Sequence, residues 1–126
     1  KAIRENKNTV KRLLAIITEY SALLDDPYLY GGCPIFNTAV EGDDAHPVLL
    51  QRAREAMDEW RNMIHITIRK GKQRKEMRQV NEDEVASVLI SSIEGAIVMA
   101  KLYKDQKHIR RTVEHLKNYV QNTIAK

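Results

Sequence analysis

The residues whose types could support chemistry are few and are scattered along the 126-residue chain. Of the four histidines, His65 is interpreted as a partly buried structural residue, while His108 and His115, seven positions apart, would share one helix face. One such pair is a poor metal site without added carboxylates. The chain has no HExxH, no CxxC, no glycine-rich phosphate loop and no glutamate followed three positions later by histidine. The sequence therefore predicts no metal site, no cofactor and no enzymatic activity.

Two single residues remain as candidates for a reactive or polar site. Cys33 is the single cysteine and precedes an expected helix start, where a redox or electrophile sensor is conceivable, but a small, inert, packed cysteine is favoured. Glu94 is the one acid inside a long apolar stretch. It either faces a ligand cavity, pairs with a base such as Arg110 or Arg111, or crosses to a second subunit. A structural pair is the default, because a lone buried carboxylate is costly.

Large apolar side chains at helical spacing offer a third possibility. Such residues usually form plain core, and less often they line a ligand cavity. The candidates are Tyr20, Phe36, Met57, Trp60, Met63 and Met99.

The composition predicts one all-α domain that positions these residues. The chain has 43% hydrophobic and 30% charged residues, with three prolines and five glycines. A single cysteine excludes an intrachain disulfide and favours a reducing interior. No apolar run is judged long enough to span a bilayer, and no signal peptide is recognised. The net charge is +4, and the basic residues cluster near the ends of the expected helices. This placement favours solvent-exposed charges that complement the helix dipoles over a DNA-binding surface.

Hydrophobic periodicity predicts about five helices. Asn8-Thr9 is expected to cap the first, which Asp25-Asp26-Pro27 ends, and Gly71 is a possible stop for the third. The expected segments are a helix tail at 1–7, helices at about 9–24, 34–41, 47–70, 81–103 and 105–124, and a basic linker at 72–80.

The stretch Val85–Leu102 carries only two charged residues, so we expect it to form a helix that is buried on most sides and on which the other helices pack. Small residues form two ridges along it, at 87, 91 and 95 and at 92, 96 and 100, and small ridges let another helix approach closely. The stretch is either the central helix of a monomeric bundle or a helix shared between the protomer core and a second copy.

The order of motifs resembles the C-terminal ligand-binding domain of TetR-family transcriptional regulators. The resemblance covers essentially the whole chain from Asn8. It rests on GGCPIFNTAVE at 31–41, DAHP at 44–47, the long helix with Trp60, the basic linker and EGAIVMAK at 94–101.

The resemblance implies a cytoplasmic homodimer whose last two helices form an intersubunit four-helix bundle. It implies a pocket for a small, often apolar effector, whose binding shifts two N-terminal helix-turn-helix heads and releases operator DNA. Residues 1–126 would be the effector-binding and dimerisation domain, with 1–7 the tail of the helix that connects to a DNA-binding domain before Lys1. Operator DNA would be bound only through that domain. A stand-alone dimerisation or adaptor module without a small-molecule ligand is the alternative.

The resemblance implies a pocket and a dimer interface, and the site residues are predicted from the apolar candidates, the lone acid and the small-residue ridges named above. The pocket is expected to be lined by Tyr20, Phe36, Trp60, Met63 and Met99, with Glu94 as its polar anchor. The dimer interface is expected to contain Leu89, Ser92, Ile93, Ala96, Ile109, Val113, Leu116 and Val120.

Overall fold

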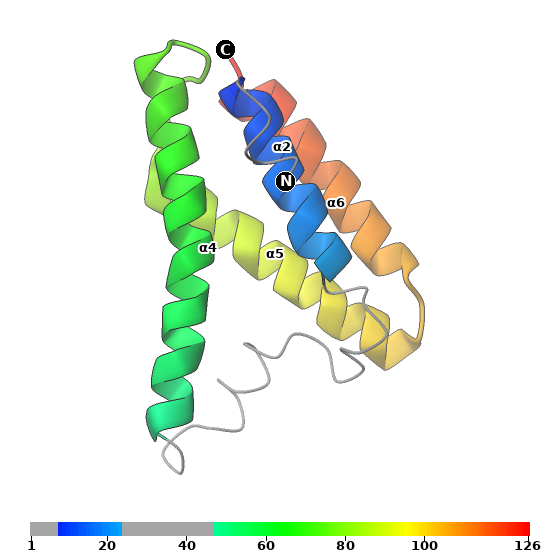
Figure 1. The fold of residues 1–126 in the computed structure, drawn as a ribbon. Coiled ribbons are helices and arrows are strands. Elements are labelled where there is room, and N and C mark those ends of the chain that lie inside the picture. Colours follow the sequence, from blue (N-terminus) through cyan, green and yellow to red (C-terminus); the bar gives the residue numbers. More distant parts are fainter. Residues whose placement is uncertain (1–7, 24–46) are drawn as a thin grey trace.

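The computed structural model describes residues 8–23 and 47–126 (Figure 1). Its elements are α2 (Thr9–Leu23), α4 (Pro47–Gln73), α5 (Glu82–Tyr103), α6 (Lys107–Tyr119) and the π-helix η2 (Val120–Ile124). Over these ranges the β-structure is limited to one isolated bridge, between Met77 and Ala125. The predicted all-α class is confirmed. The predicted helix at 34–41, Cys33, Phe36 and the tail at 1–7 lie outside the described residues.

The four α-helices pack around one apolar core. α2 lies alongside α6, and α4 contacts α2 and α5. α5 begins behind α4 and runs to the turn that leads into α6, which it also contacts (Figure 1). The C-terminal half of α4 carries most of its buried residues, whereas Val48 and Leu49 at its start are exposed. The largest fully buried apolar side chains are Leu13, Ile16, Ile17, Ile68, Met77, Leu89, Val120 and Ile124.

α2 begins at the predicted cap. The backbone N–H groups of Val10 and Lys11 donate to Asn8 Oδ1 at 2.9 and 3.1 Å, which satisfies donors that the first helical turn leaves free. Its buried residues recur every three or four positions, so one face of the helix meets the core.

Gly71 does not end α4 as predicted, since the helix continues to Gln73. The glycine is needed for space. A Cβ atom placed on it would lie 2.5 Å from Met77 Sδ and 2.8 Å from Thr9 Oγ1. The start of α2 and the α4–α5 connection therefore both pack directly on the backbone of α4.

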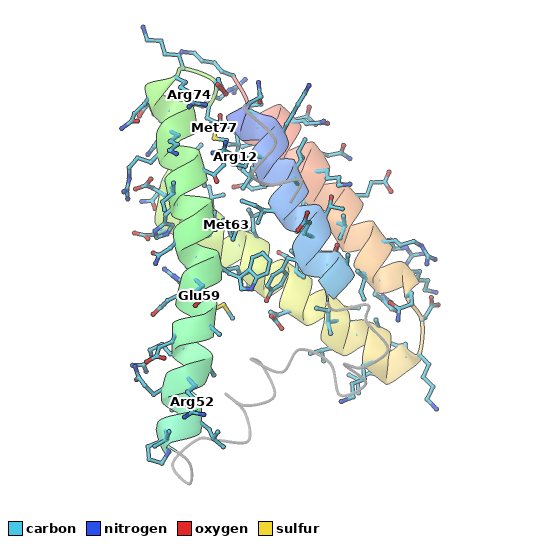
Figure 2. The ribbon with its side chains drawn as sticks, in the orientation of Figure 1. Arg12, Arg52, Glu59, Met63, Arg74 and Met77 are labelled. Atoms are coloured by element: carbon cyan, nitrogen blue, oxygen red, sulfur yellow. The ribbon has the colours of Figure 1, made fainter. Side chains whose placement is uncertain are left out.

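The connection between α4 and α5, predicted as a basic linker, is packed against the end of the chain. Met77 is buried, and the Arg78 N–H donates to the Ile124 carbonyl at 2.8 Å. The Lys126 N–H donates to the Glu76 carbonyl at 3.0 Å. Figure 2 shows Arg74 and Met77 at this end of the molecule, close to the start of α2. The C-terminus thus fixes the connection that leads into α5.

α5 starts and stops at local signals. The Glu84 N–H donates to Asn81 Oδ1 at 3.0 Å, so Asn81 caps the helix that the sequence predicts from about residue 81. Three acidic residues in the first turn complement the helix dipole. The helix ends where Lys104 adopts a left-handed conformation with φ of 52°.

The sequence analysis expected no apolar run long enough to span a bilayer, and α5 corrects that expectation. An 18-residue window of this helix has a mean hydropathy of 1.7, so by length and composition alone the helix could cross a membrane. Half of that window is buried inside the fold. Core helices of soluble proteins pass the same test, and α5 packs on α4 and α6 in this fold.

Candidate ligand pocket

Three helices bring Tyr20, Trp60 and Glu94 together. Tyr20 on α2 is 3% exposed and Glu94 on α5 is 6% exposed, and the Tyr20 hydroxyl donates a hydrogen bond to Glu94 Oε1. The ring of Trp60 on α4 meets the Tyr20 ring edge to face, with centroids 4.5 Å apart and planes at 83°. These three of the predicted pocket residues therefore form one contact group, although 74 positions separate Tyr20 from Glu94 in sequence.

The carboxyl group of Glu94 is only half satisfied. Oε1 accepts from Tyr20, but Oε2 is buried and has no hydrogen-bond partner among the described residues. Among the described residues, Glu94 does not form the predicted ion pair with Arg110 or Arg111. Both arginines are exposed on α6. A buried acceptor without a partner costs on the order of 1–3 kcal/mol, so this oxygen is a place where a ligand would gain affinity.

Glu94 lines an open pocket between α4 and α5. Its volume is about 630 Å³, within the range of small-molecule sites. The lining combines apolar side chains with two hydroxyls, one carboxyl and one guanidinium. Its residues are Met57, Arg61, Ser87, Ile90, Ser91, Glu94, Gly95 and Val98.

Ile90 separates this pocket from a small internal cavity. That cavity measures about 10 Å³ and is bounded by the rings of Tyr20 and Trp60 together with core aliphatic residues. Ile90 lines both spaces. The aromatic pair therefore lies directly behind the pocket wall.

Ion pairs fix the helix start beside the pocket. Asp83 Oδ1 lies 3.8 Å from Arg61 Nη2 and 3.0 Å from His65 Nε2. One turn further along α4, Arg69 Nη2 donates to Glu82 Oε1 at 3.2 Å, and this hydrogen bond lowers the pKa of Glu82 below its ordinary value. Arg61 thus lines the pocket while Asp83 partly balances its charge.

The remaining predicted pocket residues lie elsewhere. Met63 packs against the core from α4 without lining the pocket. Met99 is 45% exposed and is not among the residues that line the pocket. Phe36 falls outside the described residues. Sequence reasoning missed Arg61, and its spacing of four from Met57 was the available signal.

The predicted interface residues divide into two groups. Leu89, Ile93 and Ala96 on α5 are buried within the single chain, as are Leu116 on α6 and Val120 at the start of η2. Side chains enclosed in the protomer core have little surface left for a partner. Ser92, Ile109 and Val113 are partly exposed.

The side of α5 next to the pocket is left uncovered by the described helices, and Gly95 belongs both to this side and to the pocket lining. Its exposed apolar residues follow helical spacing along the outer side of α5 and end beside the start of α6. At that end the Tyr103 ring lies 5.4 Å from the His108 ring, centroid to centroid. We call this face the α5 stripe, and its residues are Val88, Gly95, Met99, Leu102 and Tyr103.

A second groove lies between α2 and α6. It has a volume of about 460 Å³ and is lined mainly by polar residues of α6 with Thr18, Ser21 and Ala22 of α2. Partly exposed Ile109 and Val113 lie in it, so they face α2 and not the α5 stripe. Over the described ranges, no group of three or more histidine, cysteine, aspartate or glutamate side chains is placed to hold a metal ion.

Comparison with known proteins identifies this arrangement. Residues 9–116 match the family described as tetracyclin repressor-like, C-terminal domain. The chain is similar to the crystal structure of a TetR transcriptional regulator from Chloroflexus aurantiacus J-10-FL, with 33% identity and a TM-score of 0.90 over 98% of this chain. It is also similar to a TetR-family regulator from Cytophaga hutchinsonii, with 28% identity and a TM-score of 0.81 over 99% of this chain. No curated protein matches the sequence.

The fold and these matches define a regulatory domain of the all-helical type. The chain belongs to the TetR family of transcriptional regulators, to whose C-terminal domain its residues correspond. It spans 63% of the length of each of the two similar chains.

Proposed function

We propose that this chain is the effector-binding and dimerisation domain of a TetR-type transcriptional repressor. The observation that carries the proposal is the pocket between α4 and α5, which reaches the buried carboxyl group of Glu94. A pocket with a mainly apolar wall and a few polar groups is the usual form of a small-molecule site. The occupant is a small, largely apolar effector, and the domain has no catalytic role.

The hydrogen bond from Tyr20 to Glu94 supports a route from the pocket to the rest of the protein. Glu94 lies on the pocket wall, and Tyr20 belongs to α2, the first described helix of the chain. A ligand that moves Glu94 would therefore change the position of α2 relative to α5. In the full-length protein α2 follows the DNA-binding head, so the two heads change their separation and operator DNA is released. This is a shift between two arrangements with different affinities for DNA.

The α5 stripe supports the homodimer. An exposed row of apolar and small residues on the longest apolar helix is typical of a surface that a second copy covers. The stripe lies beside the start of α6, so α5 and α6 of both subunits would form the intersubunit four-helix bundle. The dimer works in the cytoplasm, where TetR-type regulators meet their operators.

A pocket-blocking variant tests the proposal. Ser91 is exposed and lines the pocket, so Ser91→Trp fills the space without entering the core. Asn62→Trp, at an exposed α4 position outside the pocket lining, is the matched control. A library of small, mainly apolar compounds is screened for a rise in melting temperature, since a ligand that binds the native state stabilises it.

The expected result is at least one compound that stabilises the wild type and Asn62→Trp but not Ser91→Trp. Equal stabilisation of all three proteins would place the binding elsewhere and contradict the proposal. The absence of any stabilising compound would favour a dimerisation module without a ligand.

A further inference from the structure

The unpartnered oxygen of Glu94 defines the chemistry of the missing occupant. The side chain is more than nine-tenths buried and lines the pocket, yet Oε2 has no hydrogen-bond partner among the described residues. Tyr20 already donates to Oε1, which orients the carboxyl group and leaves the second oxygen as an acceptor. A ligand that fits this wall must therefore donate a hydrogen bond.

No polar group of the described pocket lining, Ser87 included, donates to Oε2. Ser91 Oγ lies 3.4 Å from the Val88 carbonyl, to which it donates, and Arg61 extends toward Asp83. Among the described residues of the lining, Glu94 is the one acid. Its charge is therefore left for the occupant to balance.

We infer that the effector is an apolar molecule that carries a protonated amino group, which donates to Glu94 Oε2. An ammonium group is favoured over a hydroxyl because a hydrogen bond between two charged groups is the stronger one, and because the cation offsets the buried negative charge. An anionic ligand would place like charges together. The pairing of Arg61 with Asp83 lowers the repulsion that a cation meets on the opposite wall. This inference rests on the proposed function, because it needs the pocket to be the effector site.

Three probes of matched shape and different charge test the inference. They are 4-phenylbutylamine, 4-phenylbutanol and 4-phenylbutanoate, each titrated into the full chain at neutral pH by calorimetry. The amine is expected to bind at least about tenfold more tightly than the alcohol, and the carboxylate most weakly. Ser91→Trp should abolish amine binding, which locates the site in the pocket.

Two variants separate the charge from the shape of Glu94. Glu94→Gln keeps an oxygen that can accept from Tyr20 but removes the charge, so amine affinity should fall about tenfold while alcohol affinity changes little. Tyr20→Phe leaves the carboxylate in place, so the preference for the amine should persist. If Glu94→Gln does not fold, the order of the three probes and the Ser91→Trp result decide the question.

The outcomes also separate this inference from the proposed function. Equal binding of amine and alcohol to the wild type, lost in Ser91→Trp, would overturn the amine and leave the effector pocket intact. If none of the three probes binds, the inference of an amine effector is likewise wrong. The compound library then decides whether the pocket binds any effector. Amine binding that survives both Glu94→Gln and Ser91→Trp would contradict both.

Discussion

Tyr20 on α2 donates a hydrogen bond to Glu94 on α5, and this contact joins the first described helix to the wall of the pocket. Both side chains are buried, so the bond is made in a medium that strengthens it and makes its loss expensive. The same contact positions the carboxyl group and gives α2 a polar tie to the apolar helix. Stability and the proposed signalling route therefore share one pair of residues.

Removal of the Tyr20 hydroxyl is the first prediction. Tyr20→Phe removes the hydrogen bond to Oε1 of Glu94, whose Oε2 already has no partner among the described residues. The loss should lower the free energy of unfolding by about 1–3 kcal/mol. Chemical denaturation followed by circular dichroism measures the change. Tyr103→Phe, at an exposed ring, is the control and should change stability little. Equal stability of both variants would show that the bond contributes nothing net.

The two helical glycines should respond oppositely to alanine. Gly71→Ala forces a Cβ atom against Met77 Sδ and Thr9 Oγ1, which should cost roughly 1–3 kcal/mol of stability. Within the protomer, Gly95→Ala meets nothing within 4 Å and removes a flexible residue from a helix, so it should raise protomer stability by up to about 1 kcal/mol. Thermal melts compare the two. A neutral Gly71→Ala would mean that α2 does not pack as closely on α4 as described.

Glu76 should make the fold sensitive to acid. Its carboxylate accepts from the Thr9 hydroxyl at 2.7 Å and the Thr9 N–H at 2.9 Å. These hydrogen bonds lower its pKa, and Arg74 and Arg12 add to the effect. Because the folded pKa lies below the ordinary value, the stabilisation is fully present above the ordinary carboxyl range. It is lost as the pH falls through the folded pKa.

Glu76→Gln should therefore be less stable than the wild type at neutral pH and approach it in acid. Melting temperatures between pH 3 and pH 7 measure this difference. Glu59→Gln, at an exposed position on α4 that Figure 2 labels, is the control and should follow the wild-type profile. A constant gap between Glu76→Gln and the wild type across this pH range would contradict the assignment to the Glu76 charge.

The α5 stripe should hold the dimer. Met99→Glu and Leu102→Glu place a charge on exposed apolar positions, so each should weaken or abolish dimerisation without unfolding the protomer. Sedimentation should give twice the chain mass of 14.5 kDa for the wild type and a single chain mass for the variants. Ile66→Glu, at a comparably exposed position on α4, should stay dimeric. Dimers that persist in both stripe variants would place the interface on another face.

Local signals made much of the fold predictable. Asn8 and Asn81 cap the helices expected to begin there, because a side-chain oxygen beside a free N–H needs no distant partner. Gly71 misled the prediction, since the glycine is required by close packing from distant segments and not by a turn. The clamp of the C-terminus on the α4–α5 connection is also a long-range contact with no local sequence pattern.

The candidate site was predictable only in part. Large aromatic residues and a lone acid pointed to Tyr20, Trp60 and Glu94, which the fold brings together. The faces of α5 were harder to assign, because apolar residues that meet the protomer core and those that would meet a partner recur with the same period. The sequence therefore placed Leu89 and Ile93 at the dimer interface although they are buried in the protomer core, and it placed Met99 in the pocket although its side chain is exposed.

A crystal structure of the chain with a stabilising compound tests the central claim most directly. We expect ligand density between Met57 and Arg61 of α4 and Ser91 and Glu94 of α5, within hydrogen-bond distance of Glu94 Oε2. Density confined to the groove between α2 and α6, where Ile109 and Val113 lie, would contradict it and move the effector site to the other side of the fold.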